Sequence, residues 1–181
     1  MRSFITSEMM VHVALCTSKD PQNVLLISQD ATAMQAEVAK HQDISASVIG
    51  CSIDALRDTS DNSFDVVINE GATDAASLAH INRVLKEDGL LVTKHPSLEN
   101  VEENKALMQI LANYFKIIMP YNLGDGTTAL LASKAYHPTA DIILHRADML
   151  DGLEYYNCDI HPAAFAMPNY IRKEYLGIIK N

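Results

Sequence analysis

The chain has 181 residues, of which 14 are Lys or Arg and 23 are Asp or Glu, giving a formal net charge of −9. This acidic balance argues against nucleic-acid binding, because neutralising phosphates requires clustered Lys and Arg. Hydrophobic residues make up 48% and charged residues 20% of the chain, the balance of one globular domain. No run approaches the roughly 18 uncharged apolar residues of a membrane helix.

Cysteine usage points to a reduced, cytoplasmic protein without a bound metal. Cys16, Cys51 and Cys158 lie far apart and have no nearby His pair at ligand spacing. They therefore fit neither a disulfide framework nor a zinc site. The start of the chain does not read as a signal peptide, because Glu8 and His12 interrupt its apolar residues.

The first elements alternate between helix and strand. Apolar spacing predicts a helix over residues 4–15, which the residues before Pro21 bring to an end. The apolar run Val24–Ile27 is typical of a strand buried on both faces of a parallel sheet. A helix over 32–41, a strand over 46–50, a helical turn over 53–57 and a strand over 64–68 are predicted to follow.

The same alternation continues through the middle of the chain. A helix is predicted over 75–85, with Gly89 at its C-cap. The later elements predicted are a strand over 90–93, a helix over 101–114, and strands over 115–119 and 128–133 around a Gly124–Gly126 turn. This order predicts a doubly wound α/β sheet. Such sheets bind ligands at the carboxyl ends of their strands, which here are residues 28–32, 50–53, 69–74 and 94–97.

The tail that begins near Asp141 carries an unusual string, YYN at 155–157, DIH at 159–161 and AAFAMP at 163–168. This string resembles the C-terminal signature of the spermidine synthases, the polyamine aminopropyltransferases. Glu8-Met9, FDVVI at 64–68 and LKEDG at 85–89 agree with the same family in the same order. Lys94-His95-Pro96 looks most like the family branch of some ε-proteobacteria.

The resemblance implies a Rossmann-like sheet of the kind found in S-adenosylmethionine-dependent methyltransferases. It implies a single domain, with a leading helix in 1–20, a sheet core in 21–134 and a helical tail in 135–181. The stretch between the second strand and FDVVI is short, so one βα unit is expected to be shortened. The family's small N-terminal β domain has no counterpart in this sequence.

The reaction implied is transfer of the aminopropyl group of decarboxylated S-adenosylmethionine to putrescine, giving spermidine and methylthioadenosine. Decarboxylated S-adenosylmethionine is then a co-substrate, with no bound cofactor. The partners are small polyamine and nucleoside molecules, and a homodimer is allowed. Both substrates are cations, so an acidic pocket is expected, with a carboxylate to take a proton from the attacking amine.

Three residues match the amine side of the family site. Glu70 stands where the family has the Asp that deprotonates the attacking amine. Asp74 lies next to the position of a second family carboxylate, and Tyr155 matches the signature tyrosine that contacts the amine. The competing interpretations are a solvated loop carboxylate for Glu70 and a core aromatic for Tyr155. His95 and His161 are expected to be structural.

The nucleoside side departs from the family pattern. Ser28–Thr32 replaces a glycine-rich turn, and Asp30 lies one position from the family's Asp, although a helix N-cap is the favoured interpretation of Asp30. Ser52 stands where an acidic residue would bind the ribose hydroxyls. These departures keep a second hypothesis open, a catalytically inactive homologue retained for binding or assembly. A methyltransferase on the same scaffold is a third.

Overall fold

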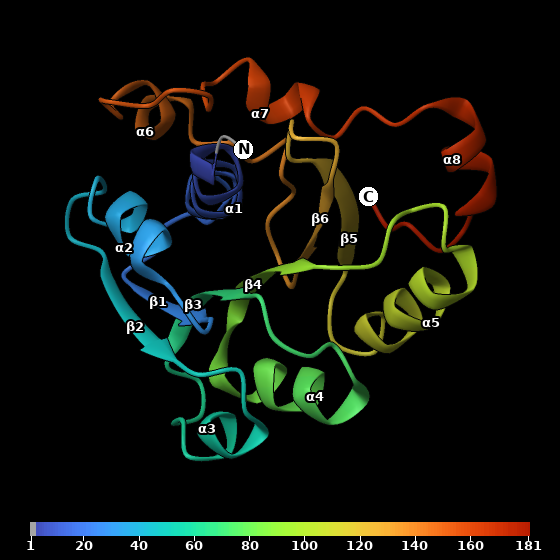
Figure 1. Ribbon diagram of the computed structural model, residues 1–181, viewed down its shortest axis with the longest axis horizontal. Coiled ribbons are helices and arrows are strands. Elements are labelled where there is room, and N and C mark those ends of the chain that lie inside the picture. The colour runs from blue at the N-terminus through green and yellow to red at the C-terminus, as the bar shows by residue number, and fades with distance from the viewer. Residues whose placement is uncertain (1–2) are drawn as a thin grey trace.

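The computed structural model describes residues 3–181 as one open sheet with helices on both faces (Figure 1). The elements in chain order are α1 (Ser3–Thr17), β1 (Asn23–Ile27), α2 (Thr32–Val38), β2 (Ser45–Ile49), α3 (Ile53–Arg57), β3 (Phe64–Asn69), α4 (Ala75–Val84), β4 (Leu85–Lys94), α5 (Val101–Leu111), β5 (Ile117–Asn122), β6 (Thr128–Ser133), α6 (Leu144–Asp148), α7 (Ile160–Ala163) and α8 (Asn169–Glu174).

The sheet has six strands in the order β2-β1-β3-β4-β6-β5. The pairs among β2, β1, β3 and β4 are parallel, and β6 is antiparallel to both β4 and β5. The predicted Rossmann-like α/β fold is therefore confirmed. The chain moves from β1 outward to β2 and then crosses back to β3, so the order switches between β1 and β3. Only the five-residue α3 lies on that crossover.

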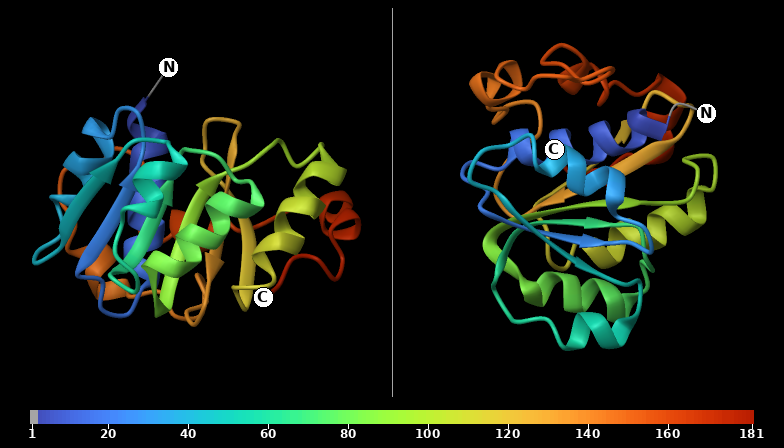
Figure 2. Two further views of the ribbon diagram at one scale, coloured as in Figure 1. Left: turned by 90° about the horizontal axis from the view of Figure 1, so that it is seen from below. Right: turned by 60° about the vertical axis from the view of Figure 1, so that its left-hand side comes forward.

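Alternate residues of each central strand enter two different cores. Leu26, Ile68 and Val92 pack with α1 and α2, whereas Leu25 and Val67 pack with α4 and α5 on the other face. This two-sided burial explains why the strands are continuous apolar runs. Figures 1 and 2 show α1 and α2 on one side of the sheet and α3, α4 and α5 on the other.

Helix α1 is buried on nearly all sides because it lies between the sheet and the tail (Figure 1). Its residues from Met9 to Val11 and from Val13 to Cys16 are fully buried. The Arg146 guanidinium of α6 donates to the carbonyls of Leu15, Ser18 and Lys19, where α1 ends. The tail therefore satisfies backbone groups that a helix end leaves without partners.

The structure corrects the prediction of a glycine C-cap at Gly89. Helix α4 ends at Val84, because Leu85 is already extended and pairs with Phe64 of β3. Gly89 lies within β4, and a Cβ there would come 2.9 Å from Leu85 Cδ2. The missing side chain thus makes room for Leu85 rather than reversing the chain.

Smaller differences concern element ends. Helices α2 and α5 stop three residues earlier than predicted, at Val38 and Leu111, and β5 runs from Ile117 to Asn122. The predicted strand over 128–133 and the helical turn over 53–57 are confirmed. Among residues 3–181, no helix is both long and apolar enough to cross a membrane.

Candidate functional site

Three polar side chains lie in a row at the carboxyl edge of the parallel strands. Ile27 of β1 pairs with Asn69 of β3, and Asn69 pairs with Thr93 of β4. The next residues along these strands, Ser28, Glu70 and Lys94, are therefore neighbours across the edge. Ser28 and Glu70 flank the switch in strand order, which is the usual ligand position in such a sheet.

The Glu70 carboxylate has a partner on each oxygen. The Ser28 hydroxyl donates to Oε2 at 2.5 Å, and Lys94 Nζ lies 2.6 Å from Oε1. The Glu70 side chain is 23% exposed and that of Lys94 is 50% exposed. The row is thus a hydrogen-bonded carboxylate that solvent and a small ligand can reach.

A cavity of about 190 Å³ lies beside this row, between the ends of β1, β2 and β3. Ser52 and Asp74 both line this cavity, although the family resemblance assigns Ser52 to the nucleoside and Asp74 to the amine. Its remaining lining is mostly apolar and small: Ile27, Cys51, Ile53, Leu56, Asn69, Gly71, Ala72 and Ser77. The cavity is smaller than the 300 Å³ or more of typical small-molecule sites.

The side chains of Ser52 and Asp74 both begin helices. Ser52 Oγ accepts the N–H of Ala55 at 3.2 Å at the start of α3. One Asp74 oxygen accepts the N–H groups of Ala76 and Ser77 at the start of α4, and the other accepts the Ser77 hydroxyl. Hydrogen bonds from Ser77 hold the pKa of Asp74 below its usual value.

Asp30 lies one residue before Ala31, the N-cap residue of α2. Its Oδ1 accepts the Thr32 hydroxyl at 2.7 Å and the Thr32 N–H at 3.1 Å. These two hydrogen bonds lower the pKa of Asp30. Asp30 therefore stabilises the turn before α2 rather than serving as its N-cap, and it donates its own N–H to Ser28 Oγ at 3.1 Å.

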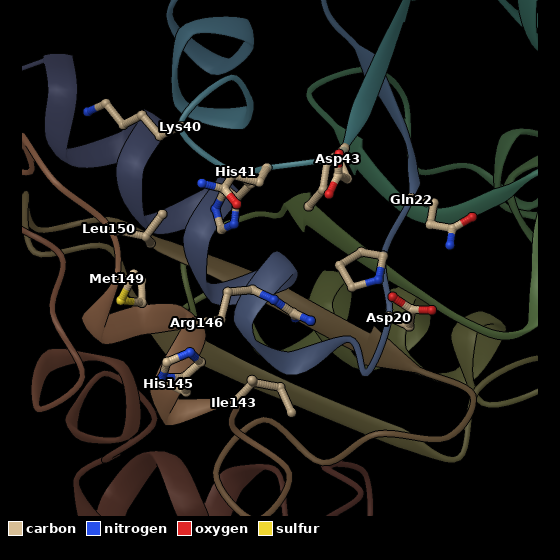
Figure 3. Close-up of a pocket in the computed structure, with 13 residues that line it drawn as sticks. Asp20, Gln22, Lys40, His41, Asp43, Ile143, His145, Arg146, Met149 and Leu150 are labelled. Carbon is tan, nitrogen blue, oxygen red and sulfur yellow. The ribbon is translucent and has the colours of Figure 1, made fainter.

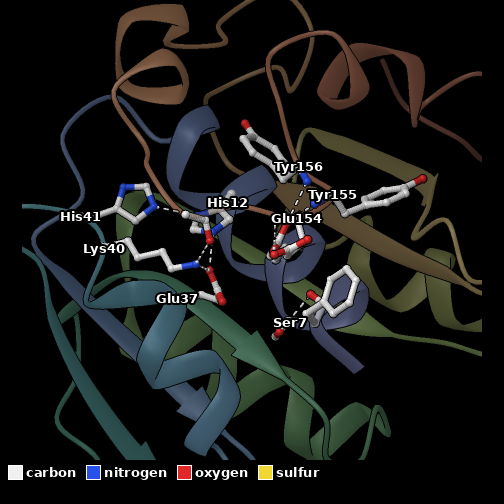
Figure 4. Close-up of polar contacts among 11 residues, drawn as sticks. Ser7, His12, Glu37, Lys40, His41, Glu154, Tyr155 and Tyr156 are labelled. Carbon is white, nitrogen blue, oxygen red and sulfur yellow. Dashed lines mark hydrogen bonds and ion pairs between the residues drawn. The ribbon is translucent and has the colours of Figure 1, made fainter. Parts of the chain in front are cut away.

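A side chain of α1 holds the backbone of Tyr155 in place. The Glu8 carboxylate, only 1% exposed, accepts the backbone N–H groups of Glu154, Tyr155 and Tyr156 at 2.8–2.9 Å (Figure 4). The Tyr155 phenol lies directly over Gly124 in the β5–β6 turn, where a Cβ would overlap it. Within residues 3–181, no hydrogen bond joins the Tyr155 side chain to Glu70.

A second cavity, of about 340 Å³, follows directly after Lys94. It lies between the end of β4, the β5–β6 turn and α8. The sequence did not predict this cavity, because α8 lies far from β4 along the chain. Its polar lining includes His95, Glu99 and Thr128. His95 Nδ1 lies 2.7 Å from Asn104 Oδ1 and its Nε2 lies 2.9 Å from Thr128 Oγ1, and burial lowers its pKa.

A third cavity, about 510 Å³, lies at the opposite edge of the sheet, before β1 and β2 (Figure 3). His41 lines this cavity and is the outermost of three hydrogen-bonded side chains that continue into the core. His41 Nε2 lies 2.9 Å from His12 Nδ1, and His12 Nε2 donates to Glu37 at 2.9 Å (Figure 4). Burial, together with His12 and Arg146, lowers the pKa of His41 to about 3.

His161 is also structural, as expected. Its Nε2 donates to the Pro138 carbonyl at 2.9 Å, and the Tyr156 hydroxyl lies 2.7 Å from its Nδ1. It is fully buried, and this burial lowers its pKa to about 4. Tyr156 and His161 thus fasten the tail beside α1, and Tyr155 is the less buried of the two tyrosines.

Comparisons with known proteins agree with this architecture, although no protein-family model matches the chain. The polyamine aminopropyltransferase of Helicobacter pylori (strain G27) is 26% identical over 210 residues, covering 98% of this chain and 79% of that protein. That of Helicobacter acinonychis (strain Sheeba) is 33% identical over 119 residues, covering 61% of this chain and 44% of that protein.

Solved structures support the fold. Spermidine synthase in complex with the transition-state analogue AdoDATO superposes with a TM-score of 0.82 at 21% identity, covering 94% of this chain and 75% of that one. Spermidine synthase from Thermotoga maritima gives a TM-score of 0.81 at 22% identity, covering 94% and 74%. The chain is thus similar in sequence to polyamine aminopropyltransferases and has the fold of spermidine synthase.

Proposed function

We propose that the chain is an aminopropyltransferase that transfers the aminopropyl group of decarboxylated S-adenosylmethionine to putrescine, giving spermidine and methylthioadenosine. The observation that carries the proposal is the position of Glu70, a reachable carboxylate at the switch in strand order. Homology to polyamine aminopropyltransferases supports the same reaction. A carboxylate at this edge suits a reaction in which both substrates are cations.

In the proposed reaction, Glu70 accepts a proton from one ammonium group of putrescine. The freed amine attacks the aminopropyl carbon that is bonded to sulfur. The new C–N bond forms as the C–S bond breaks, and the electron pair of the broken bond returns to sulfur. Methylthioadenosine then leaves as a neutral thioether, and the product amine carries the positive charge.

Each predicted site residue has one role in the proposed reaction. Glu70 is the base, and Tyr155 and Asp74 hold the diamine. Asp30 and Ser52 contact the nucleoside of the co-substrate. Ser52 and Asp74 also cap helices and Asp30 also accepts two hydrogen bonds from Thr32, so each would use oxygen lone pairs that these contacts leave free.

We further propose that residues 1–181 act as a single domain. Its parts are residues 1–20 before the sheet, the sheet core over 21–134 and the tail over 135–181. Residues of α1, the sheet and the tail share one hydrophobic core, which supports this division into parts of one unit.

Contacts already made by three predicted site residues favour a second candidate, a catalytically inactive homologue that keeps the scaffold for binding or assembly. Ser52 and Asp74 already cap helices, and Asp30 already accepts two hydrogen bonds from Thr32. The cavity between Ser52 and Asp74 has only about 190 Å³, which is small for a nucleoside. This candidate predicts a stable fold that binds neither substrate.

Ligand-dependent melting separates the two candidates. A ligand that binds only the folded chain stabilises it by about 2.7 kcal/mol at a hundredfold excess over its Kd. The aminopropyltransferase predicts a higher melting temperature with methylthioadenosine and with putrescine. An unchanged melting temperature with both ligands would favour the inactive homologue.

A further inference from the structure

Lys94 presents a primary ammonium group to Glu70 at the end of β4. Its Nζ lies 2.6 Å from Glu70 Oε1, while the Ser28 hydroxyl occupies Oε2 at 2.5 Å. Both oxygens of the carboxylate are therefore engaged within the chain itself. A cationic amine arriving from solvent has to share or replace one of these two contacts.

Of the two contacts, the ion pair with Lys94 is the easier to displace. Ser28 is 5% exposed, and its oxygen is fixed further by the N–H of Asp30. The Lys94 side chain is 50% exposed and extends from the last residue of β4. An ammonium group on a flexible four-carbon stem can leave for solvent without moving the backbone.

The chemistry of Lys94 matches that of the proposed acceptor. A lysine side chain ends in a primary ammonium on four methylene groups, and a short diamine ends in the same group on a similar chain. Each would donate N–H groups to the same carboxylate oxygen. The contact between Lys94 and Glu70 is thus a copy, within the chain, of the contact that an amine substrate would make.

We propose that Lys94 is an internal competitor for the amine substrate: its ammonium group occupies Glu70 Oε1 in the free protein and has to move aside before the acceptor amine can bind there. This inference rests on the proposed function, because it takes Glu70 as the carboxylate that receives the amine. Lys94 then sets how tightly the acceptor binds and excludes weakly bound cations from the base.

The expected size of the effect follows from the exposure of the pair. An ion pair whose lysine is half exposed is a weak interaction, so the carboxylate is free for a substantial fraction of the time. Competition by such a pair reduces the apparent affinity for the acceptor by the fraction of free carboxylate, about two- to sixfold. Removing the Lys94 charge should recover this factor.

The test compares putrescine binding by isothermal titration calorimetry in the full chain and three variants. Lys94→Met, which keeps the length of the stem, is expected to bind putrescine about two- to sixfold more tightly than the wild type. Lys94→Arg keeps the cation and should bind like the wild type. Lys86→Met is the matched control, because Lys86 pairs with Asp65 at 2.8 Å near the opposite end of β3.

Two results would overturn the inference. Equal or weaker putrescine binding by Lys94→Met shows that Lys94 does not compete, and a similar gain in Lys86→Met shows that the effect is one of overall charge. Spermidine formation separates this failure from that of the proposed function. Spermidine formed with an unchanged KM for putrescine in Lys94→Met overturns only the competitor, whereas no spermidine and no putrescine binding in any variant overturn both.

Discussion

The carboxylate of Glu8 accepts the backbone N–H of Tyr155 at 2.8 Å, although 147 residues separate the two in the chain. Because the same carboxylate also takes the N–H groups of Glu154 and Tyr156, it fixes the backbone of the whole segment. A single buried side chain of α1 thus determines where the tail presents Tyr155.

Replacing Glu8 should therefore destabilise the fold. Glu8→Ala leaves three buried or part-buried N–H groups without their charged acceptor, and we expect a loss of about 3 kcal/mol in the free energy of unfolding. Urea denaturation measures this loss. Glu154→Ala, in the same segment but exposed, is the matched control and should change stability by less than about 0.5 kcal/mol. Similar losses in both variants would show that Glu8 does not anchor the tail.

The two glycines of the β5–β6 turn offer a direct test of Tyr155. Gly124 has a φ of +95° and Gly126 a φ of +93°, so alanine is strained by about 1–2 kcal/mol at either position. Only at Gly124 would the new Cβ overlap the Tyr155 phenol, whereas nothing lies within 4 Å at Gly126. Gly124→Ala should raise the KM for putrescine and Gly126→Ala should not. Steady-state kinetics that respond equally to both changes would argue against a role for Tyr155.

The two proposed roles of Asp74 can be separated by choice of substitution. Serine caps helices about as well as aspartate, whereas alanine costs about 1 kcal/mol. We expect Asp74→Ser to keep the melting temperature and weaken putrescine binding, because it retains the cap at α4 and loses the charge. Asp74→Ala should lose both. Undiminished putrescine binding by Asp74→Ser, measured by calorimetry, would reduce Asp74 to a helix cap.

Buried histidines predict how stability depends on pH. The pKa of His41 is lowered by burial from 6.5 to about 3, and that of His161 to about 4. Because the unfolded chain binds protons to these groups first, stability is fully present above pH 6.5 and is lost as the pH falls toward those values. Each histidine should cost about 2 kcal/mol between pH 7 and pH 5.

Urea denaturation at a series of pH values measures this slope. His41→Asn should flatten the fall in stability between pH 7 and pH 5, whatever its effect on stability at pH 7. Gln42→Ala, a neighbouring substitution without a titrating group, should keep the slope of the wild type. An unchanged slope in His41→Asn would mean that His41 takes up its proton in the folded state as readily as in the unfolded one.

Most of the sheet could be predicted because its strands are buried on both faces. Val24–Ile27 and FDVVI at 64–68 are continuous apolar runs with no competing helical period. Gly89 could not be interpreted from local pattern alone. Its absent side chain accommodates Leu85, and this contact depends on the pairing of Leu85 with a different strand.

Part of the candidate site could also be predicted from the sequence. Residues that follow buried parallel strands meet at one edge, so Ser28 and Glu70 could be expected to lie together. The pairing of Glu70 with Lys94 could not, because it depends on the register between β3 and β4. The anchoring of Tyr155 by Glu8 is a contact between distant segments, which no local pattern indicates.

The most direct measurement is the appearance of products when the purified chain is incubated with decarboxylated S-adenosylmethionine and putrescine. Mass spectrometry should find spermidine and methylthioadenosine in equal amounts with the wild type and with Glu87→Gln, an exposed control on β4. Glu70→Gln should keep its fold and form neither product at a measurable rate. Absence of both products with the wild type, or undiminished formation with Glu70→Gln, would contradict the proposed reaction or the role of Glu70 in it.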